Sequence, residues 1–416
     1  MKSPVRRMAV AATAPLRDFL RAETSGGVVL IAAAVAALVW ANSPAADGYV
    51  QFWQQKITLG GGSMVVSHDL RHWVNDGLMA VFFFVIGLEI KRELTVGELR
   101  DRRAALLPAA AAVGGVVIPA LIFVAMVGSG AALRGWGIPM ATDIAFAVGI
   151  LTLLGRHASV GAKLFLLSIA IVDDILAIGV IALFYTSTIS LWWLGGAVAG
   201  LLAVVVLRRF GVNSPWSYLP VGVMVWFAML ESGVHATLAG VALGLLTPAR
   251  PVNGRAVLGE LEHALHPVSA FLVIPVFALA NAGVDLRGGV IGDALRQPLV
   301  WAIIAGLVIG KIVGIGAVAH LLRWRRWGTL PADMHPREIL GVAALGGIGF
   351  TVSLFITDLA YVDPGLTSLA KVAILAASVL AAAIGSVLLL TAPAGTGEPI
   401  NHSDEDVDGN TATNTA

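Results

Sequence analysis

The sequence predicts an all-α integral membrane protein with twelve transmembrane helices. Of its 416 residues, 57% are hydrophobic and only 13% are charged, whereas soluble domains average about 45–50% apolar and about 25% charged residues. The segments 26–46, 104–133, 191–207 and 372–397 contain no charged residue. Because about 20 apolar residues form a helix long enough to cross a bilayer, each of these segments is a candidate span.

Other segments are equally apolar but contain one or two ionisable groups or a cluster of Gly and Pro, and they complete the set of spans. The predicted spans are, in order, 26–42, 70–92, 104–127, 136–154, 162–185, 190–207, 216–231, 233–248, 262–283, 298–321, 338–359 and 368–391. With the N-terminus in the cytoplasm, 20 of the 27 Lys and Arg residues fall in inner segments and 6 in outer segments or at their edges. Cytoplasmic loops carry such an excess of positive charge, so this distribution supports both the number of spans and their orientation. The one remaining basic residue, Lys311, lies within a span.

Three further segments flank or interrupt the twelve-helix domain, which is predicted to extend over 25–391. Residues 1–24 begin with basic residues and contain no continuous apolar core, which predicts an amphipathic segment at the cytoplasmic interface rather than a cleaved signal peptide. The longest outer loop, 47–68, is predicted to form a hairpin, and its strand edges are a candidate dimer contact. The acidic, low-complexity tail 392–416 is predicted to be disordered in the cytoplasm.

Charge and cysteine content exclude several classes of function. The formal net charge is +1, so the chain has no basic field to attract nucleic acid. It contains no cysteine, which excludes disulfides and thiolate metal sites. We expect membrane lipid around the chain, and we expect no cofactor.

Four ionisable residues lie well inside predicted spans: Asp143, Asp173, Asp174 and Lys311. A charge at the bilayer centre costs about 2.5–3.5 kcal/mol on insertion scales, so each residue needs a reason to be there. One interpretation is a buried ion pair that holds helices together, and the other is a transport site. Adjacent helical residues point about 100° apart. We therefore expect one of the paired aspartates to line a cavity and the other to reach it from the side or meet a counter-charge.

Two predicted spans are interrupted at membrane depth. In the fourth span, Pro139 precedes Thr142 and Asp143, and a proline breaks the helical hydrogen-bond ladder. In the eleventh span, the interruption at 346–351 has the sequence Gly-Gly-Ile-Gly-Phe-Thr. These glycines lack the Lys-Ser/Thr ending of a phosphate-binding loop, so a broken helix is the better interpretation. Freed carbonyls are tolerated at this depth only beside protein or a water-filled cavity.

The donor set suggests which ions such a site would bind. Carboxylates, a threonine hydroxyl and unwound carbonyls are hard oxygen ligands, which suit Na⁺, Li⁺ or protons rather than soft metals. A carboxylate that holds either a cation or a proton makes exchange possible, because one excludes the other. Lys311 fits this chemistry as a counter-charge or as a group that releases a proton itself.

At these residues the sequence resembles the NhaA family of sodium/proton antiporters, from about Ser25 to about Leu390. The most specific matching pieces are 87–93 (GLEIKRE), 141–146 (ATDIAF), 171–174 (IVDD), 232–240 (SGVHATLAG), 261–263 (LEH) with His266-Pro267, 309–311 (IGK) and 347–351 (GIGFT). The resemblance implies twelve helices in which spans three to five and ten to twelve form an inverted repeat, with the fourth and eleventh spans unwound where they cross. It also implies a homodimer in a bacterial inner membrane, with both termini in the cytoplasm.

The activity implied by the resemblance is secondary active transport rather than an enzymatic reaction. The transporter would exchange intracellular Na⁺ or Li⁺ for external protons, electrogenically and with activation at alkaline pH, for sodium and pH homeostasis. Asp173 and Asp174 would carry the cation and the protons, supported by Thr142 and Asp143, while Lys311 and Asp143 would offset the charges of the half-helix ends. The residues implied at the helix break are Gly347, Gly349 and Thr351, and those implied in pH sensing are Glu89, Glu93, Glu262, His263, His266 and His235.

Some features leave alternatives open. Glu262, His263 and His266 could also be read as a metal site, although a firm third ligand is missing. The acidic residues expected at the end of the eighth span are absent after 246–250, and Asp76 has no assigned role. The competing functions are a proton-coupled symporter of a small organic solute, an intramembrane aspartyl protease and a passive channel. A symporter is disfavoured because Lys311 is the single intramembrane basic group. A protease is disfavoured because the aspartate pair lies on one helix. A channel is disfavoured because the spans contain few hydrophilic residues.

Overall fold

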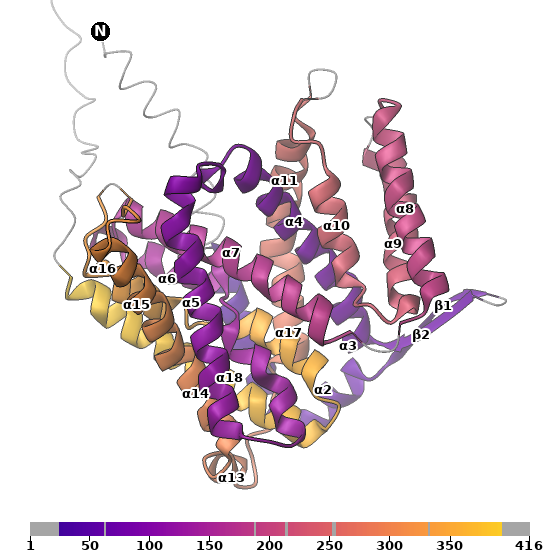
Figure 1. Ribbon diagram of the computed structural model, residues 1–416. Helices are drawn as coiled ribbons and strands as arrows, with labels where there is room; N and C mark the ends of the chain where they lie inside the picture. The colour runs from indigo at the N-terminus through magenta and orange to yellow at the C-terminus, as the bar shows by residue number, and fades with distance from the viewer. Residues whose placement is uncertain are drawn as a thin grey trace, which may run out of the picture.

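The computed structural model describes residues 25–61, 64–186, 189–212, 215–251, 255–331 and 333–392, and it shows an all-helical membrane protein with one β-hairpin (Figure 1). The predicted N-terminal segment 1–24 and residues 393–416 of the predicted tail lie outside the described residues.

The first half of the described chain contains the hairpin and the helices up to α8. Its elements are Ser25–Ala41, α2 (Ala46–Trp53), β1 (Lys56–Gly61), β2 (Met64–Asp69), α3 (Leu70–His72), η1 (Trp73–Leu78), α4 (Met79–Thr95), η2 (Glu98–Arg100), α5 (Arg102–Val127), η3 (Ala131–Met140), α6 (Ile144–Leu153), η4 (Gly155–His157), α7 (Val160–Phe184) and α8 (Leu191–Arg209).

The second half is helical throughout its regular structure. Its elements are α9 (Pro215–Ser232), α10 (Thr237–Leu246), α11 (Val257–Val268), η5 (Ser269–Val273), α12 (Ile274–Asn281), α13 (Val290–Ala294), α14 (Pro298–Ala305), η6 (Gly306–Gly310), α15 (Lys311–Trp324), α16 (Glu338–Leu345), α17 (Phe350–Ala360) and α18 (Pro364–Leu390).

Length and apolar composition qualify 7 of the described helices to cross a membrane, or up to 10 if each bent pair is one span. Three of the long helices are continuous through a short π-helical segment: 70–95 through η1, 257–281 through η5 and 298–324 through η6. The predicted ranges 216–231 and 233–248 correspond to α9 and to the shorter apolar helix α10, which fall outside that set.

The distribution of polar and apolar side chains is that of a protein surrounded by lipid. Large apolar residues face outward, as Trp192 on α8 (84% exposed) and Leu183 on α7 (79% exposed) show. The charged residues Asp173 and Lys311 are buried instead, with 1% and 0% exposure. Apolar surface gains nothing by leaving lipid, whereas an ionised group there is costly, so this arrangement suits a bilayer.

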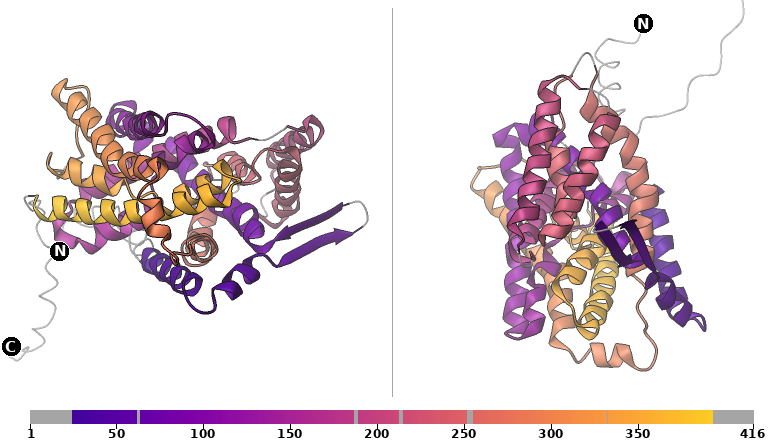
Figure 2. Two further views of the ribbon diagram at one scale, coloured as in Figure 1. Left: turned by 90° about the horizontal axis from the view of Figure 1, so that it is seen from below. Right: turned by 90° about the vertical axis from the view of Figure 1, so that its right-hand side faces the viewer.

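Both predicted interruptions are confirmed as bent helix pairs. η3 and α6 meet at 41° across residues 141–143, and α16 and α17 meet at 42° across residues 346–349. A third bend was not predicted: α2 follows the first helix at 116° and occupies part of what the sequence suggested was loop. β1 and β2 pair antiparallel, from Lys56 opposite Asp69 to Gly61 opposite Met64. Figure 2 shows that this hairpin projects away from the helices.

The helices pack as two bundles. In the first bundle, α4 packs on α10 and α11, and α8 packs on α9. In the second bundle, α5 packs on α7, α14 and α15, and α18 packs on α14, α16 and α17. The most extensive contacts between the bundles are those of α4 with α7 and of α12 with α17. Figure 1 shows α8 and α9 at the outer flank of the first bundle.

The tightest crossing of the first bundle depends on small residues. Gly240 of α10 lies against the backbone of α4, where a Cβ atom would overlap the carbonyl oxygen of Ala80. Gly244, one turn further along, faces Gly87 of α4 in the same way. Small residues four positions apart allow membrane helices to approach closely enough for backbone packing.

We predict that Gly240→Ala lowers the free energy of unfolding by about 1–3 kcal/mol, because the added methyl group has no space at this crossing. Thermal unfolding of the purified protein in detergent measures the effect. The matched control is Gly195→Ala on α8, where a Cβ atom would meet nothing within 4 Å. Equal unfolding temperatures for the two variants would contradict the packing argument.

Candidate functional site

The two helix breaks lie against each other and satisfy each other's backbone groups. The amide nitrogen of Asp143 donates to the carbonyl oxygen of Ile348 at 2.6 Å. The hydroxyl of Thr142 donates to the carbonyl oxygen of Gly346 at 2.8 Å. This approach requires glycine, because a Cβ atom on Gly347 would overlap the carbonyl oxygen of Leu307, and one on Gly349 would overlap the Ser353 hydroxyl.

Asp143 joins the N-terminal ends of two half-helices. It is the N-cap of α6, and its Oδ1 accepts from the amide nitrogen of Phe146 at 3.0 Å. Its Oδ2 accepts from the amide nitrogen of Thr351 at 3.0 Å and from the Thr351 hydroxyl at 2.7 Å, at the start of α17. A carboxylate at this position offsets the partial positive charge of both helix ends.

Asp173 forms a fully buried ion pair with Lys311. The Lys311 Nζ atom donates to Asp173 Oδ2 at 2.8 Å and to the Thr142 hydroxyl at 3.0 Å. The second carboxylate oxygen, Oδ1, is buried and has no hydrogen-bond partner among the described residues. Lys311 begins α15, directly after the π-helical segment η6, whereas Asp173 lies near the middle of α7.

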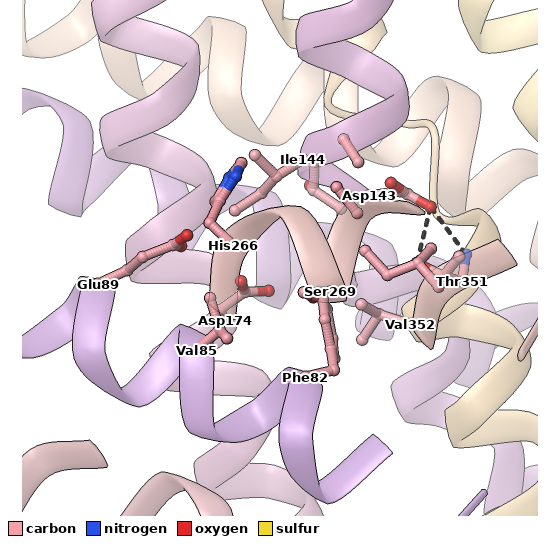
Figure 3. A pocket seen from close by; sticks show the side chains of 14 residues that line it. Phe82, Val85, Glu89, Asp143, Ile144, Asp174, His266, Ser269, Thr351 and Val352 are labelled. Carbon is pink, nitrogen blue, oxygen red and sulfur yellow. Dashed lines mark hydrogen bonds between the residues drawn. The ribbon is translucent and has the colours of Figure 1, made fainter. Parts of the chain in front are cut away.

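Asp174 faces a different environment from its neighbour. It lines a cavity of about 40 Å³ together with Thr142, Asp143 and Thr351 from the helix breaks. In Figure 3, Asp174 and Glu89 lie at one side of this cavity, and Asp143 and Thr351 lie at the other. A volume of this size holds a few water molecules, so a small cation could enter with part of its hydration shell. The π-helical segment η5 contributes Ser269 and Ala270 to the same wall.

The six residues implied in pH sensing are not all together. Glu89 of α4 and His266 of α11 line the cavity. Glu262 accepts a hydrogen bond from Arg92 at 2.5 Å, and Arg92 also contacts Glu93 at 3.4 Å. His263 lies on the same helix but is exposed. His235 is separate from this cluster, since its Nε2 contacts the carbonyl oxygen of Tyr185 at the end of α7.

Sequence reasoning missed several buried polar residues. Lys371 of α18, one of the 6 basic residues predicted to lie in outer segments or at their edges, is buried and pairs with Asp358 of α17 at 2.9 Å. Asn75 and Asn281 contact the same pair. The available signal was that Asp358 ends one apolar segment and Lys371 begins the next. Hydropathy does not show that these two ends meet. The described residues contain no group of three or more His, Asp or Glu side chains that could hold a metal ion.

We predict that Lys311→Ala destabilises the protein by about 3–5 kcal/mol, because it leaves the Asp173 carboxylate buried without its partner. The double variant with Asp173→Ala should regain most of this loss, which thermal unfolding measures. Arg255→Ala is the control, since it removes an exposed ion pair with Glu260 and should change stability by less than about 1 kcal/mol. A loss no larger than that of the control would contradict the burial argument.

The whole site lies within a region that matches a known family. The family model described as Na⁺/H⁺ antiporter 1 matches residues 17–389. The chain is 44% identical to Na⁺/H⁺ antiporter NhaA 2 of Pseudomonas putida, covering 91% of this chain and 93% of the relative. It is 47% identical to NhaA 2 of Erythrobacter litoralis, with 91% and 94% covered, and 45% identical to NhaA of Escherichia coli, with 89% and 96% covered. The chain therefore belongs to the NhaA family of Na⁺/H⁺ antiporters and is a multi-pass membrane transporter of Na⁺ and H⁺ rather than an enzyme.

Proposed function

We propose that this transporter exchanges intracellular Na⁺ or Li⁺ for external protons, electrogenically and with activation at alkaline pH, and so serves sodium and pH homeostasis. The observation that carries this proposal is the division of labour within the aspartate pair. Asp174 lines the cavity, whereas Asp173 is neutralised by Lys311. The site thus presents one carboxylate to an entering ion and keeps a second one paired until a cation arrives.

Competition between a cation and protons follows from this geometry. A cation in the cavity would be met by Asp174 and by the hydroxyl oxygens of Thr142 and Thr351, which are hard ligands. Asp173 would join these ligands when its bond to Lys311 opens, and its unpartnered Oδ1 is already available. Proton binding to the carboxylates removes the negative charge that holds the cation.

The same groups support a stoichiometry of two protons for each cation. With protons bound, Asp174 is neutral and Lys311 pairs as a cation with Asp173, so the three groups carry no net charge. With Na⁺ or Li⁺ bound, both carboxylates are ionised and Lys311 is neutral. One proton has then left Asp174 and one has left Lys311, and the loaded site carries one negative charge in total. Each cycle therefore moves net charge across the membrane.

We propose twelve spans with both termini in the cytoplasm of a bacterial cell, in its inner membrane. The 20 to 6 distribution of basic residues supports this orientation, and α9 and α10 would supply the seventh and eighth spans. Spans three to five and ten to twelve would form an inverted repeat, with the two bent helix pairs in corresponding places. The projecting hairpin, whose outer strand edges are unpaired in this two-stranded sheet, would pair with a second copy in a homodimer.

The exchange is tested in proteoliposomes that hold a preformed acidic interior and a pH-sensitive dye. We expect Na⁺ or Li⁺, but not K⁺, to release the proton gradient, and we expect Asp174→Asn to abolish this release because it removes the exchangeable carboxylate. Asp285→Asn is a matched control outside the site, where the carboxylate pairs with Arg287 on the surface. The proposal fails if K⁺ is equally effective, or if exchange survives loss of both Asp173 and Asp174.

The pH response is tested at the charged cluster near the cavity. We expect Glu262→Gln to shift the pH of half-maximal exchange to a lower value by about half a unit or more. The variant leaves Arg92 less neutralised, and added positive potential makes proton release from neighbouring groups easier. His263→Ala, on the same helix but exposed, should leave the profile in place. An unshifted profile for Glu262→Gln would remove this residue from the proposed sensor.

A further inference from the structure

Four buried or partly buried side chains form a closed ring of hydrogen bonds away from the cation site. Lys371 donates to Asn281 at 3.4 Å, Asn281 donates to Asn75 at 2.7 Å, and Asn75 donates to Asp358 at 3.0 Å. The ion pair between Lys371 and Asp358, at 2.9 Å, closes the ring. We call Asn75, Asn281, Asp358 and Lys371 the polar ring. Each member therefore has a hydrogen-bond partner on both sides.

The polar ring connects the two bundles. Asn75 lies in η1, which continues into α4, and Asn281 lies at the end of α12, which continues α11 through η5, so both belong to the first bundle. Asp358 of α17 and Lys371 of α18 belong to the second bundle. The two contacts that cross the boundary are Asn75 to Asp358 and Lys371 to Asn281. The ion pair of Lys371 with Asp358 lies within the second bundle, and the hydrogen bond between Asn281 and Asn75 lies within the first.

The polar ring and the cation cavity lie on the same boundary, at different depths. Along α17, Thr351 lines the cavity, Phe355 follows one turn later and Asp358 reaches the ring. At about 1.5 Å per residue, the seven positions from Thr351 to Asp358 correspond to about 10 Å. Along α12, Ile274 lines the cavity, and Phe277 and Asn281 follow in the same order.

A layer of aromatic rings separates the cavity from the polar ring. The centroid of Phe355 lies 5.4 Å from that of Phe83 on α4 and 6.4 Å from that of Phe277 on α12. All three side chains are buried. In the orientation proposed above, the polar ring lies on the outer side of this layer, so ions from outside would have to pass it to reach Asp174.

We propose that the polar ring is the latch that holds the outer side of the transporter closed. Its outer carboxylate, Asp358, keeps 17% of its side-chain surface exposed, so water reaches the ring from that side. When the bundles part, the only bonds of the polar ring that have to break are those of Asn75 with Asp358 and of Lys371 with Asn281. Lys371 and Asp358 remain paired, and the two amides turn to water, which satisfies a neutral amide at little cost. No charge is left unpaired, which makes the latch reversible.

The test uses the absence of cysteine from the chain. Ser269→Cys places one reporter thiol in the cavity wall of the full-length protein. In membrane vesicles of known sidedness, a charged, membrane-impermeant methanethiosulfonate reagent is added from the outer or the inner side. We expect Asn75→Ala and Asn281→Ala to raise outer-side labelling about tenfold over the reporter alone, which corresponds to about 1.4 kcal/mol. Inner-side labelling should not rise.

A charge exchange distinguishes a latch from a merely structural contact. Asp358→Ala should raise outer-side labelling, whereas Asp358→Lys combined with Lys371→Asp should return it to the level of the reporter alone. An amide offers both a donor and an acceptor, so turning both asparagines reverses the direction of every bond in the ring. The double exchange therefore keeps both contacts across the boundary.

Asp285→Asn is the control, because its carboxylate also pairs with an arginine on the outer side but within one loop. The bonds from Arg287 lower the pKa of Asp285 to about 2, so it is ionised throughout the assay. The proposal is overturned if both asparagine variants stay within twofold of the reporter alone, if the control rises equally, or if labelling rises from both sides. Labelling does not require transport, and the latch requires only that the carrier opens to both sides. A failure of the proposed exchange would therefore leave this labelling result unchanged, so the two proposals can fail separately.

Discussion

The constraint on which the site depends is that a broken helix inside a bilayer must satisfy its freed backbone groups without water. Here the two breaks do this for each other, through the bond from the Asp143 amide to Ile348 and the bond from Thr142 to Gly346. The glycines at 347 and 349 allow the two chains to come this close. Neither break would be stable without the other, so the crossing is a single cooperative unit.

The positions of the charges follow from the crossing. Two half-helices begin at it, and their partial positive ends are met by one carboxylate, Asp143, which bonds to both. Thr142 then links the crossing to Lys311, whose other bond holds Asp173. Asp174, one residue further along α7, is turned toward the cavity instead. The crossing thus lies opposite one carboxylate that faces the cavity, and this is the carboxylate to which we assign exchange in the proposed function.

Much of this arrangement could be predicted from the sequence, because its signals are local. Pro139 before a Thr-Asp pair and the glycine cluster at 346–349 indicated the breaks, and adjacent aspartates in an apolar segment indicated two different environments. The π-helical segments were not predicted, since only η5 has prolines nearby, Pro267 and Pro275, to disturb its hydrogen bonds. The contacts of Asn75 with Asp358 were also out of reach, because they join residues 283 positions apart.

The boundary between the bundles shows why some buried charges are tolerable in a protein that moves. Among the described residues, the four ion pairs with a buried member are Lys311 with Asp173, Lys371 with Asp358, and Arg92 with both Glu93 and Glu262. Each pair lies within one bundle. Breaking a buried pair leaves an uncompensated charge and costs about 3–5 kcal/mol, whereas parting aromatic rings or neutral amides leaves none. A boundary closed by phenylalanines and asparagines can therefore open without breaking any of these ion pairs, and in the proposed exchange the pair of Lys311 with Asp173 opens only when a cation binds.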